Sequence, residues 1–217
     1  MPSRAEKTAA LDQLLYGFLE ELDGGNNLTI IGIDEVGRGS LSGPLTVAAV
    51  CLPLTPRISG LNDSKKLSAA RRESLAIELY RVVVCYSIQD ICAEEIDSVG
   101  MAEALRRGVR QALGEVTDTA GEPDAVLIDG TPLHIHAKEQ AIVKGDGKVA
   151  SIAAASIIAK VHRDALMTGY SQEYPHYGWE SNKGYGSAAH IAAIRERGLS
   201  PLHRKGFCQG ILQERLF

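Results

Sequence analysis

Two short apolar segments run directly into carboxylates, and this pattern constrains the fold more than any other feature of the 217-residue chain. Residues 28–33 precede Asp34 and Glu35, and residues 125–128 precede Asp129. Apolar runs rich in β-branched residues predict buried strands. Because a desolvated carboxylate is costly without a cation, acids at the ends of such strands indicate a ligand site at one edge of an α/β sheet.

Asp34 and Glu35 are neighbours, and neighbouring side chains in a strand point to opposite faces. Both serve one site only if the strand ends or twists there, which Gly37 and Gly39 allow. A surface turn is the alternative for this pair, and an ordinary Asp-Gly turn is the alternative for Asp129. The repetition of the pattern favours the functional interpretation.

A third carboxylate, Asp146, follows the apolar residues 141–143, with a simple tight turn as the alternative. Converging carboxylates without cysteine ligands favour a hard divalent ion such as Mg²⁺ or Mn²⁺. Two such ions can activate water and stabilise the leaving oxygen of a phosphodiester. His134 and His136 would share one face of an extended segment, but no third soft ligand lies near them, which disfavours zinc.

The hydrophobic pattern elsewhere predicts further strands and a set of amphipathic helices. Strands are expected at 45–52, 82–88 and 141–143, and helices at 8–22, 68–80, 93–114, 150–166, 187–197 and 207–216. Ser68 is the expected N-cap of the second helix and Gly114 the expected end of the third. The order predicts an α/β domain with a mixed sheet and a helical C-terminal part.

Composition is that of a globular protein, with 45% apolar residues, 23% charged residues and a net charge of −4. Residues 181–205 nevertheless hold five basic side chains and one acid, which suits a phosphate backbone, although solvated helix faces are the alternative. The scattered cysteines argue against a zinc module or a disulfide framework. The N-terminus lacks the apolar region of a signal peptide, so we expect a cytoplasmic protein without a membrane anchor.

Six motifs in order make the chain resemble the ribonuclease HII family from about Thr29 to Phe207. They are Gly32-Ile-Asp-Glu-Val-Gly-Arg-Gly39, Asn62-Asp-Ser-Lys-Lys-Leu67, Leu127-Ile-Asp-Gly130, Val143-Lys-Gly-Asp146, 152–161 with Arg163-Asp164, and Asn182-Lys-Gly-Tyr-Gly186. The resemblance implies a ribonuclease H-like fold, a mixed five-stranded sheet flanked by helices. We divide the chain into an N-terminal helical extension (1–27), a catalytic domain (28–170) and a helical C-terminal region that contributes to substrate binding (171–217).

The resemblance also implies an endonuclease that hydrolyses the RNA strand of RNA–DNA hybrids. It would cut on the 5′ side of ribonucleotides embedded in DNA and leave 3′-hydroxyl and 5′-phosphate ends. The implied catalytic and metal-binding residues, for Mg²⁺ or Mn²⁺, are Asp34, Glu35, Asp129 and Asp146. The implied substrate contacts are Gly37, Arg38 and Gly39 at the RNA–DNA junction, Tyr185 on the sugar, and Lys65, Lys66, Lys183, Arg163 and Arg204 on phosphates. Glycines permit close approach to a 2′-hydroxyl, the group that separates RNA from DNA.

Two small departures from the family concern the substrate side. His162 stands where the family more often has Thr, and residues 203–207 lack an expected second Arg and a Ser. Packing of the Ala-rich helix explains Ser156 and Lys160 nearly as well as a family role does. These departures affect peripheral contacts and leave the carboxylates intact.

Two rival functions and one partner hypothesis remain open. Ribonuclease HIII shares the fold but usually carries a large N-terminal domain, for which about 27 residues before the first strand are too few. A non-catalytic nucleic-acid-binding module on the same fold would keep binding without cleavage. Residues Gln213–Phe217 resemble peptides that dock on bacterial sliding clamps, with the amphipathic end of a helix as the alternative. We expect a monomer.

Overall fold

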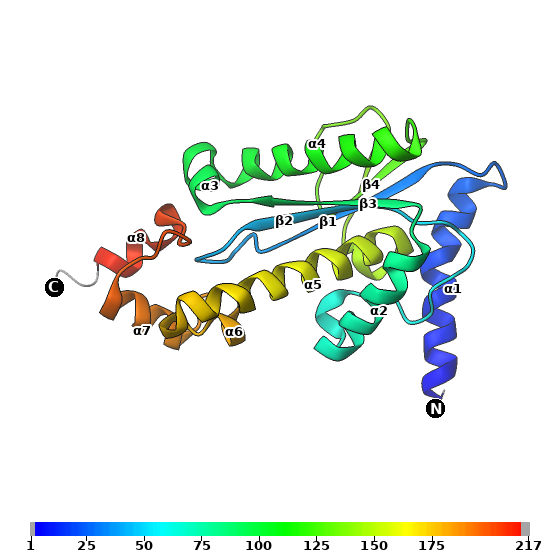
Figure 1. Cartoon of the computed structure of the whole chain (residues 1–217). Coiled ribbons are helices and arrows are strands. Elements are labelled where there is room, and N and C mark those ends of the chain that lie inside the picture. The colour runs from blue at the N-terminus through cyan, green and yellow to red at the C-terminus, as the bar shows by residue number, and fades with distance from the viewer. Residues whose placement is uncertain (1–2, 214–217) are drawn as a thin grey trace. The chain divides into compact units, whose positions relative to one another are not determined.

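The computed structural model describes residues 3–213. These residues contain a five-stranded β-sheet (Figure 1). The strands, in the spatial order β3-β2-β1-β4-β5, are β1 (Ile30–Val36), β2 (Leu45–Cys51), β3 (Cys85–Ile91), β4 (Ala125–Asp129) and β5 (Glu139–Ile142). β4 lies parallel to both β1 and β5. The predicted mixed five-stranded sheet flanked by helices is confirmed.

Helices account for most of the remaining described chain. They are α1 (Arg4–Asp23), α2 (Ala69–Val82), α3 (Ala93–Val99), α4 (Met101–Ala120), α5 (Ala150–Glu173), α6 (Trp179–Asn182), α7 (Ala188–Arg197) and α8 (Lys205–Gln213). Short 3₁₀ turns are η1 (Ser64–Lys66), η2 (Gly145–Gly147) and η3 (Pro175–Tyr177). Ser68 accepts a hydrogen bond from the Arg71 amide, which confirms it as the N-cap of α2.

The single long helix predicted at 93–114 is wrong. The chain breaks at Gly100, whose φ of +80° suits glycine, and α3 ends there. The next helix, α4, continues through Gly114 to Ala120. Gly114 does not end the helix because Val116 is buried and prolongs its apolar face.

Other boundaries shift without a change in the type of element. β3 begins at Cys85 rather than at residue 82, because Val82 completes α2. The Ala-rich helix α5 extends to Glu173 instead of ending at residue 166. The end of the helix predicted at 207–216 lies partly outside the described residues.

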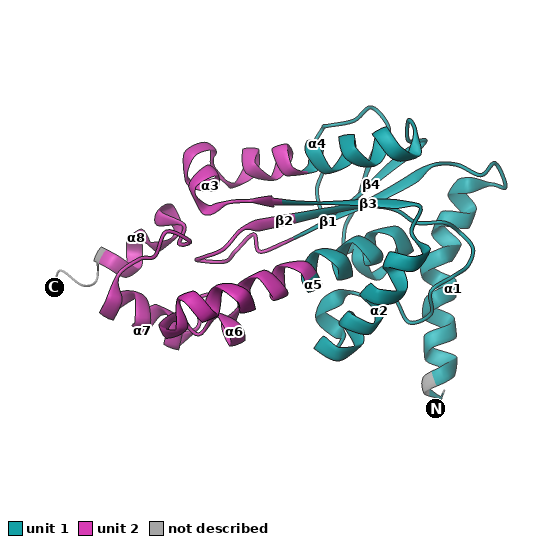
Figure 2. Cartoon of the chain, in the orientation of Figure 1, with its two compact units in different colours: residues 1–35, 47–89, 109–161 teal, residues 36–46, 90–108, 162–217 magenta. Residues whose placement is uncertain are grey.

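The chain forms two compact units that are interleaved along the sequence (Figure 2). The first unit comprises residues 1–35, 47–89 and 109–161, and the second comprises residues 36–46, 90–108 and 162–217. The contiguous division 1–27, 28–170 and 171–217 stays a prediction.

In the first unit, helices cover both faces of the sheet, with α4 on one face and α2 and α5 on the other (Figure 1). The three central strands, β2, β1 and β4, are buried almost throughout, which matches their apolar sequences, whereas the outer strands β3 and β5 are only partly buried. Gly32 of β1 permits the close approach of α5, since a Cβ at this position would collide with the backbone of Ser151. Ala153, Ala154 and Ala155, all fully buried, give this helix a thin face.

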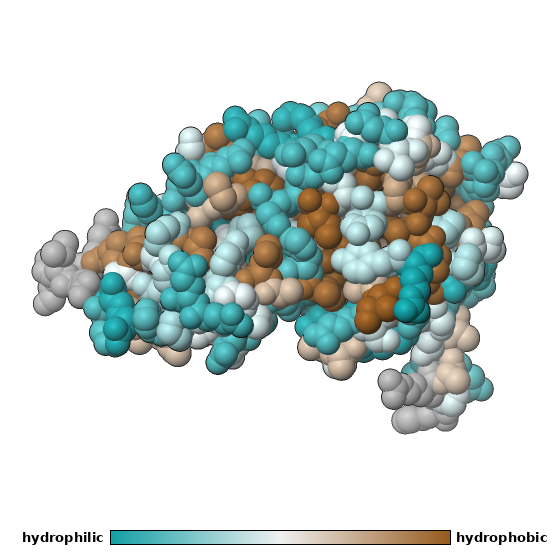
Figure 3. Space-filling model, viewed as in Figure 1, coloured by the Kyte–Doolittle hydropathy of each residue, from teal (hydrophilic) through white to brown (hydrophobic). Residues whose placement is uncertain are grey.

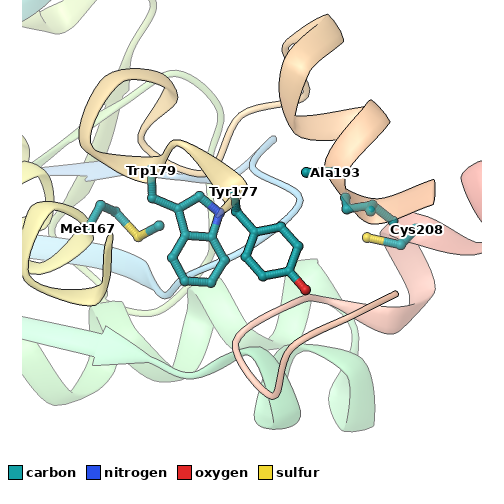
Figure 4. Close-up of a cluster of buried hydrophobic side chains, with 6 residues drawn as sticks. Met167, Tyr177, Trp179, Ala193 and Cys208 are labelled. Atoms are coloured by element: carbon teal, nitrogen blue, oxygen red, sulfur yellow. The ribbon is translucent and has the colours of Figure 1, made fainter. Parts of the chain in front are cut away.

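The core of the second unit is aromatic. Met167, Tyr177, Trp179, Ala193, Ile194 and Cys208 form a buried cluster, and Figure 4 shows Tyr177 beside Trp179. These two rings stack with centroids 5.1 Å apart and planes 17° from parallel. The arrangement joins η3 and α6 to α7 and α8.

The surface is predominantly hydrophilic on the face shown in Figure 3, with hydrophobic residues exposed between polar ones. Exposed large apolar side chains include Leu14, Ile77, Tyr80, Val84, Tyr86 and Val143. Among the described helices, none combines the length and the hydrophobicity that crossing a membrane requires.

Candidate active site

Asp34 and Asp129 lie at the same edge of the sheet because β1 and β4 are parallel. Ile33 pairs with Ile128, so the next residue on each strand is a carboxylate. Asp34 is buried and Asp129 partly buried. The local pattern of an apolar strand running into an acid therefore places two carboxylates side by side.

Asp146 completes a group of three carboxylates. It lies in η2, shortly after β5, which pairs with β4. One carboxylate oxygen each from Asp34, Asp129 and Asp146 fall within 4.8 Å of one another. The Asp129 carboxylate also accepts a hydrogen bond from the Gly145 amide at 2.6 Å, which holds the η2 turn against the end of β4.

Glu35 is placed differently from the other three predicted ligands. It is half-buried, and the group of carboxylates within 4.8 Å does not include it. The alternation of side chains along β1 explains the difference from Asp34. Glu35 is close enough to raise the pKa of Asp34, and its role as a metal ligand stays a prediction.

Ionisation of the Asp34 carboxyl group carries a high energetic cost in this site. Burial raises the pKa of its carboxyl well above the ordinary value, and the charges of Glu35 and Asp129 raise it further. A hydrogen bond from Ser156 of α5 opposes this rise. The Ser156 hydroxyl lies 2.9 Å from the buried Ser64 hydroxyl of η1, so two hydroxyls in series hold Asp34 in place.

A pocket of about 320 Å³ is lined by three lysines, by two carboxylates of the cluster, Asp129 and Asp146, and by a further carboxylate, Asp63. Its lining is Asp63, Lys65, Lys66, Lys144, Asp129, Asp146 and Gly147. Burial lowers the pKa of Lys65, but Asp146, Asp34, Asp63 and Asp129 together raise it above the ordinary value. Lys65 is thus a cation that faces the acids.

Asp63 and Lys144 were missed as site residues at the level of sequence. Asp63 caps η1 by accepting a hydrogen bond from the Lys65 amide, and it also hydrogen-bonds Asp146. Burial raises the pKa of Asp146, and the charge of Asp63 raises it further. Lys144 adopts a left-handed backbone (φ +56°) directly before η2. Both residues lie within family motifs, Asp63 in residues 62–67 and Lys144 in residues 143–146, and these motifs could have identified them as site residues.

The second unit holds the predicted Gly37-Arg38-Gly39 segment, and its two glycines differ. Gly37 has φ +88°, and a Cβ there would collide with Arg163 and the Pro44 carbonyl. At Gly39, a Cβ would meet no protein atom within 4 Å. Internal packing therefore explains Gly37, whereas Gly39 faces open space that a ligand can approach.

Arg163 and Arg204 are fully buried, which does not fit the phosphate contacts predicted for them. Arg163 donates hydrogen bonds to the carbonyls of Pro44, Ser42 and Lys183 and to the Ser40 hydroxyl, at 2.8–3.1 Å. Arg204 donates to the carbonyls of Gly43 and Arg38 at 2.9–3.1 Å. All of these donors are directed at residues 38–44 except the one that Arg163 directs at the Lys183 carbonyl, and we propose that both arginines hold the 38–44 segment.

Tyr185, Lys183 and Arg38 present groups at the surface of the second unit. The Tyr185 ring is 38% exposed, and the Arg163 guanidinium carbon lies 5.6 Å from its centroid. The Lys183 ammonium donates to the Thr168 hydroxyl at 2.6 Å, and the Arg38 side chain is exposed. Burial lowers the pKa of the Arg204 guanidinium to about 10, and nearby Arg163 contributes, so Arg204 remains a cation at neutral pH.

Comparisons with known proteins agree with this geometry. The family model for ribonuclease HII matches residues 31–210. Ribonuclease HII of Ruminiclostridium cellulolyticum is 45% identical over 185 residues, which cover 85% of this chain and 71% of that protein.

Two solved structures share the fold. The ribonuclease H2 of Pyrococcus horikoshii aligns with a TM-score of 0.72 at 26% identity, covering 87% of this chain and 99% of its own. The ribonuclease HII of Archaeoglobus fulgidus, solved as a complex with PCNA, aligns with a TM-score of 0.66 at 25% identity, covering 82% and 94%.

The family match extends from β1 to α8, so it includes the three clustered carboxylates, the lysines beside them and the Tyr185 loop. A match of this extent, together with a relative that is 45% identical, identifies the fold and the class of reaction. The chain therefore belongs to the ribonuclease HII family, whose members are endonucleases that act on RNA–DNA hybrids.

Proposed function

We propose that this chain cuts on the 5′ side of ribonucleotides, both within RNA–DNA hybrids and singly embedded in duplex DNA. The products would carry 3′-hydroxyl and 5′-phosphate ends. The observation that supports this proposal most is the group of Asp34, Asp129 and Asp146 beside the lysine-lined pocket. Acids and fixed cations in one place suit a phosphodiester that must be bound and hydrolysed.

The three carboxylates fit a hard divalent cation. They offer only oxygen ligands, and burial together with the charges of Glu35 and Asp129 raises the pKa of Asp34, a strain that a bound cation would relieve. We assign Mg²⁺ or Mn²⁺ to this site, with Glu35 as a fourth ligand on the strength of the family resemblance. Bound in a pair, such ions would activate a water molecule and stabilise negative charge on the leaving 3′-oxygen.

The chain's own residues would orient the substrate. Lys65, Lys66 and Lys144 line the pocket with the carboxylates and would hold phosphate oxygens. Gly39 would let the backbone approach the 2′-hydroxyl, and Tyr185 would pack on the sugar at the junction. Arg38 and Lys183 would contact flanking phosphates, whereas Arg163 and Arg204 would act only through the segment that they hold.

Cleavage of a labelled DNA duplex with one ribonucleotide tests the proposal directly. The assay is run with Mg²⁺, with Mn²⁺ and with EDTA, and the cut is mapped on a sequencing gel. Metal-dependent cutting on the 5′ side of the ribonucleotide is the expected result. Cutting of long hybrids alone would contradict the single-ribonucleotide activity, and binding without any cutting would favour a non-catalytic module.

Residues Gln213–Phe217 form a second part of the proposal, as a peptide that docks on a sliding clamp. The relative from Archaeoglobus fulgidus was solved with PCNA, which favours a clamp as partner, while residues 214–217 lie outside the described part of the chain. Deletion of these five residues is expected to abolish capture of the chain by immobilised clamp. Equal capture before and after the deletion would remove this part of the proposal.

A further inference from the structure

A series of hydrogen bonds between two buried histidines of the second unit ends on the backbone of Tyr185. The Nδ1 atom of His203 accepts a hydrogen bond from the Ser200 amide at 2.9 Å, so its Nε2 atom carries the proton. The Nε2 atoms of His203 and His190 lie 3.1 Å apart. The Nδ1 atom of His190 lies 2.9 Å from the Tyr185 carbonyl oxygen, and it must donate because a carbonyl only accepts.

Trp179 fixes the same arrangement of protons. Its indole nitrogen is a donor only, and it donates to Nε2 of His190 at 3.1 Å. This atom is therefore the acceptor for both Trp179 and His203, and both imidazoles are neutral. Burial agrees, since it lowers the pKa of His190 and, together with His190, lowers the pKa of His203 to about 4.

Among the described residues, no acidic side chain contributes to the pKa shift of either ring. Tyr177 packs its ring edge-on against His203, with centroids 4.7 Å apart. The adjacent cation, Arg204, directs its guanidinium to the carbonyls of Gly43 and Arg38. The histidines thus sit in an apolar, aromatic site in which only a neutral hydrogen-bonded pair is stable.

The position of the Tyr185 ring follows from the backbone that His190 holds. The Tyr185 carbonyl accepts from the Ser187 amide at 2.8 Å as well as from His190, and the Tyr185 amide donates to Asn182. Asn182 ends α6 and Ser187 is the N-cap of α7, whereas His190 lies in the first turn of α7 and reaches the Tyr185 carbonyl with its side chain. It is therefore a side-chain bond that ties the backbone at Tyr185 to the buried face of α7.

We propose that His190 is a positioning residue for substrate binding: its Nδ1–H group fixes the Tyr185 carbonyl, and His203 and Trp179 fix the His190 ring. This inference rests on the proposed contact between Tyr185 and the sugar at the junction. A single net hydrogen bond corresponds to a change of about two- to ten-fold. Because Tyr185 binds substrate rather than the reacting atoms, the change should fall on KM more than on kcat.

Two amide substitutions of His190 separate its two nitrogens. In H190N the side-chain amide stands near Nδ1 and can still donate to Tyr185, whereas in H190Q it reaches towards Nε2 and loses that bond. We expect KM for a duplex with one ribonucleotide to rise about five-fold in H190Q and to stay within two-fold of wild type in H190N. Fluorescence of Trp179, the single tryptophan, checks that the core is intact in both.

The variant Y185A distinguishes failure of the inference from failure of the proposed contact. If His190 acts through Tyr185, H190Q has no further effect on KM in the Y185A background. Equal effects of H190Q in both backgrounds, or equal KM values for H190N and H190Q, would overturn the inference. A normal KM for Y185A alone would overturn the sugar contact and the inference with it.

Discussion

Around Asp34 in the first unit, buried like charges face one another, whereas around Arg163 in the second unit buried charge meets backbone carbonyls. The carboxylates of Asp34, Asp129 and Asp146 lie within 4.8 Å and repel, and Ser156, backbone amides and the exposed Lys65 oppose the repulsion only in part, since the pKa values of Asp34 and Asp146 stay raised. Arg163 instead makes four hydrogen bonds to its own unit. The contrast teaches that clustered buried like charges indicate chemistry, while buried charge with complete hydrogen bonding indicates architecture.

The largest expected effect comes from D34N, which removes one charge from the clustered acids. Cleavage should fall by on the order of 10³-fold, because the variant loses a proposed metal ligand while the shape of the side chain is kept. Binding of the hybrid, measured by gel shift, should change by less than about three-fold. Without metal, in EDTA, D34N should not lower the midpoint of thermal unfolding, because it relieves repulsion between the carboxylates. A lower midpoint would contradict the comparison between the two units.

R163A tests the opposite half of the comparison. It leaves the carbonyls of Pro44, Ser42 and Lys183 without their donor, so the free energy of unfolding should fall by about 3 kcal/mol in urea titrations. R38A is the matched control, since Arg38 is exposed in the same segment. It should weaken substrate binding and change stability by less than about 0.5 kcal/mol. Equal stability of the two variants would contradict the reassignment of Arg163.

Acid should act on the second unit through His203. Its folded pKa of about 4 lies below the ordinary value of 6.5, so the unfolded chain binds the proton first. This contribution to stability is present above pH 6.5 and is lost as pH falls towards 4, by about 3 kcal/mol in total. Urea titrations between pH 7 and 5 measure it. H203Q, which does not titrate, should show a smaller loss over this range, and an identical loss would refute the assignment.

The variants G37A and G39A test whether Gly37 serves internal packing while Gly39 serves substrate approach. G37A forces alanine to φ +88° and into the Pro44 carbonyl, so stability should fall by about 2 kcal/mol. G39A has room for its methyl group and should keep wild-type stability while raising KM. Calorimetry and steady-state cleavage distinguish the two effects. A destabilised G39A would show that this glycine also serves packing.

The smallest expected effect concerns the hydroxyls that hold Asp34. S156A removes its side-chain hydrogen bond and should lower cleavage about ten-fold, chiefly through kcat. S151A is a matched control on the same helix, because the Ser151 hydroxyl is buried without a hydrogen-bond partner among the described residues. It should leave cleavage unchanged and stability equal or slightly higher. Similar activity of the two variants would deny Ser156 a positioning role.

Several features of the site could be predicted from local sequence because local physics decides them. A β-branched run that ends in an acid indicates a strand end with a carboxylate, and both Asp34 and Asp129 follow this rule. The pairing of β1 with β4 then brings them together. Gly114 shows the limit of such reasoning, since a glycine is compatible with a helix when its neighbours remain buried.

The sequence by itself determined the strand-end carboxylates, the basic loops and the family, since each depends on residue types in short, ordered motifs. Only the tertiary structure decided which cations face solvent and which lie inside. The sequence does not distinguish Arg163 and Arg204 from Lys65 and Lys66, because the residue type gives the charge of a side chain but not its exposure to solvent. Segments more than a hundred residues apart supply the carbonyls that enclose these arginines, and that enclosure exists only after packing.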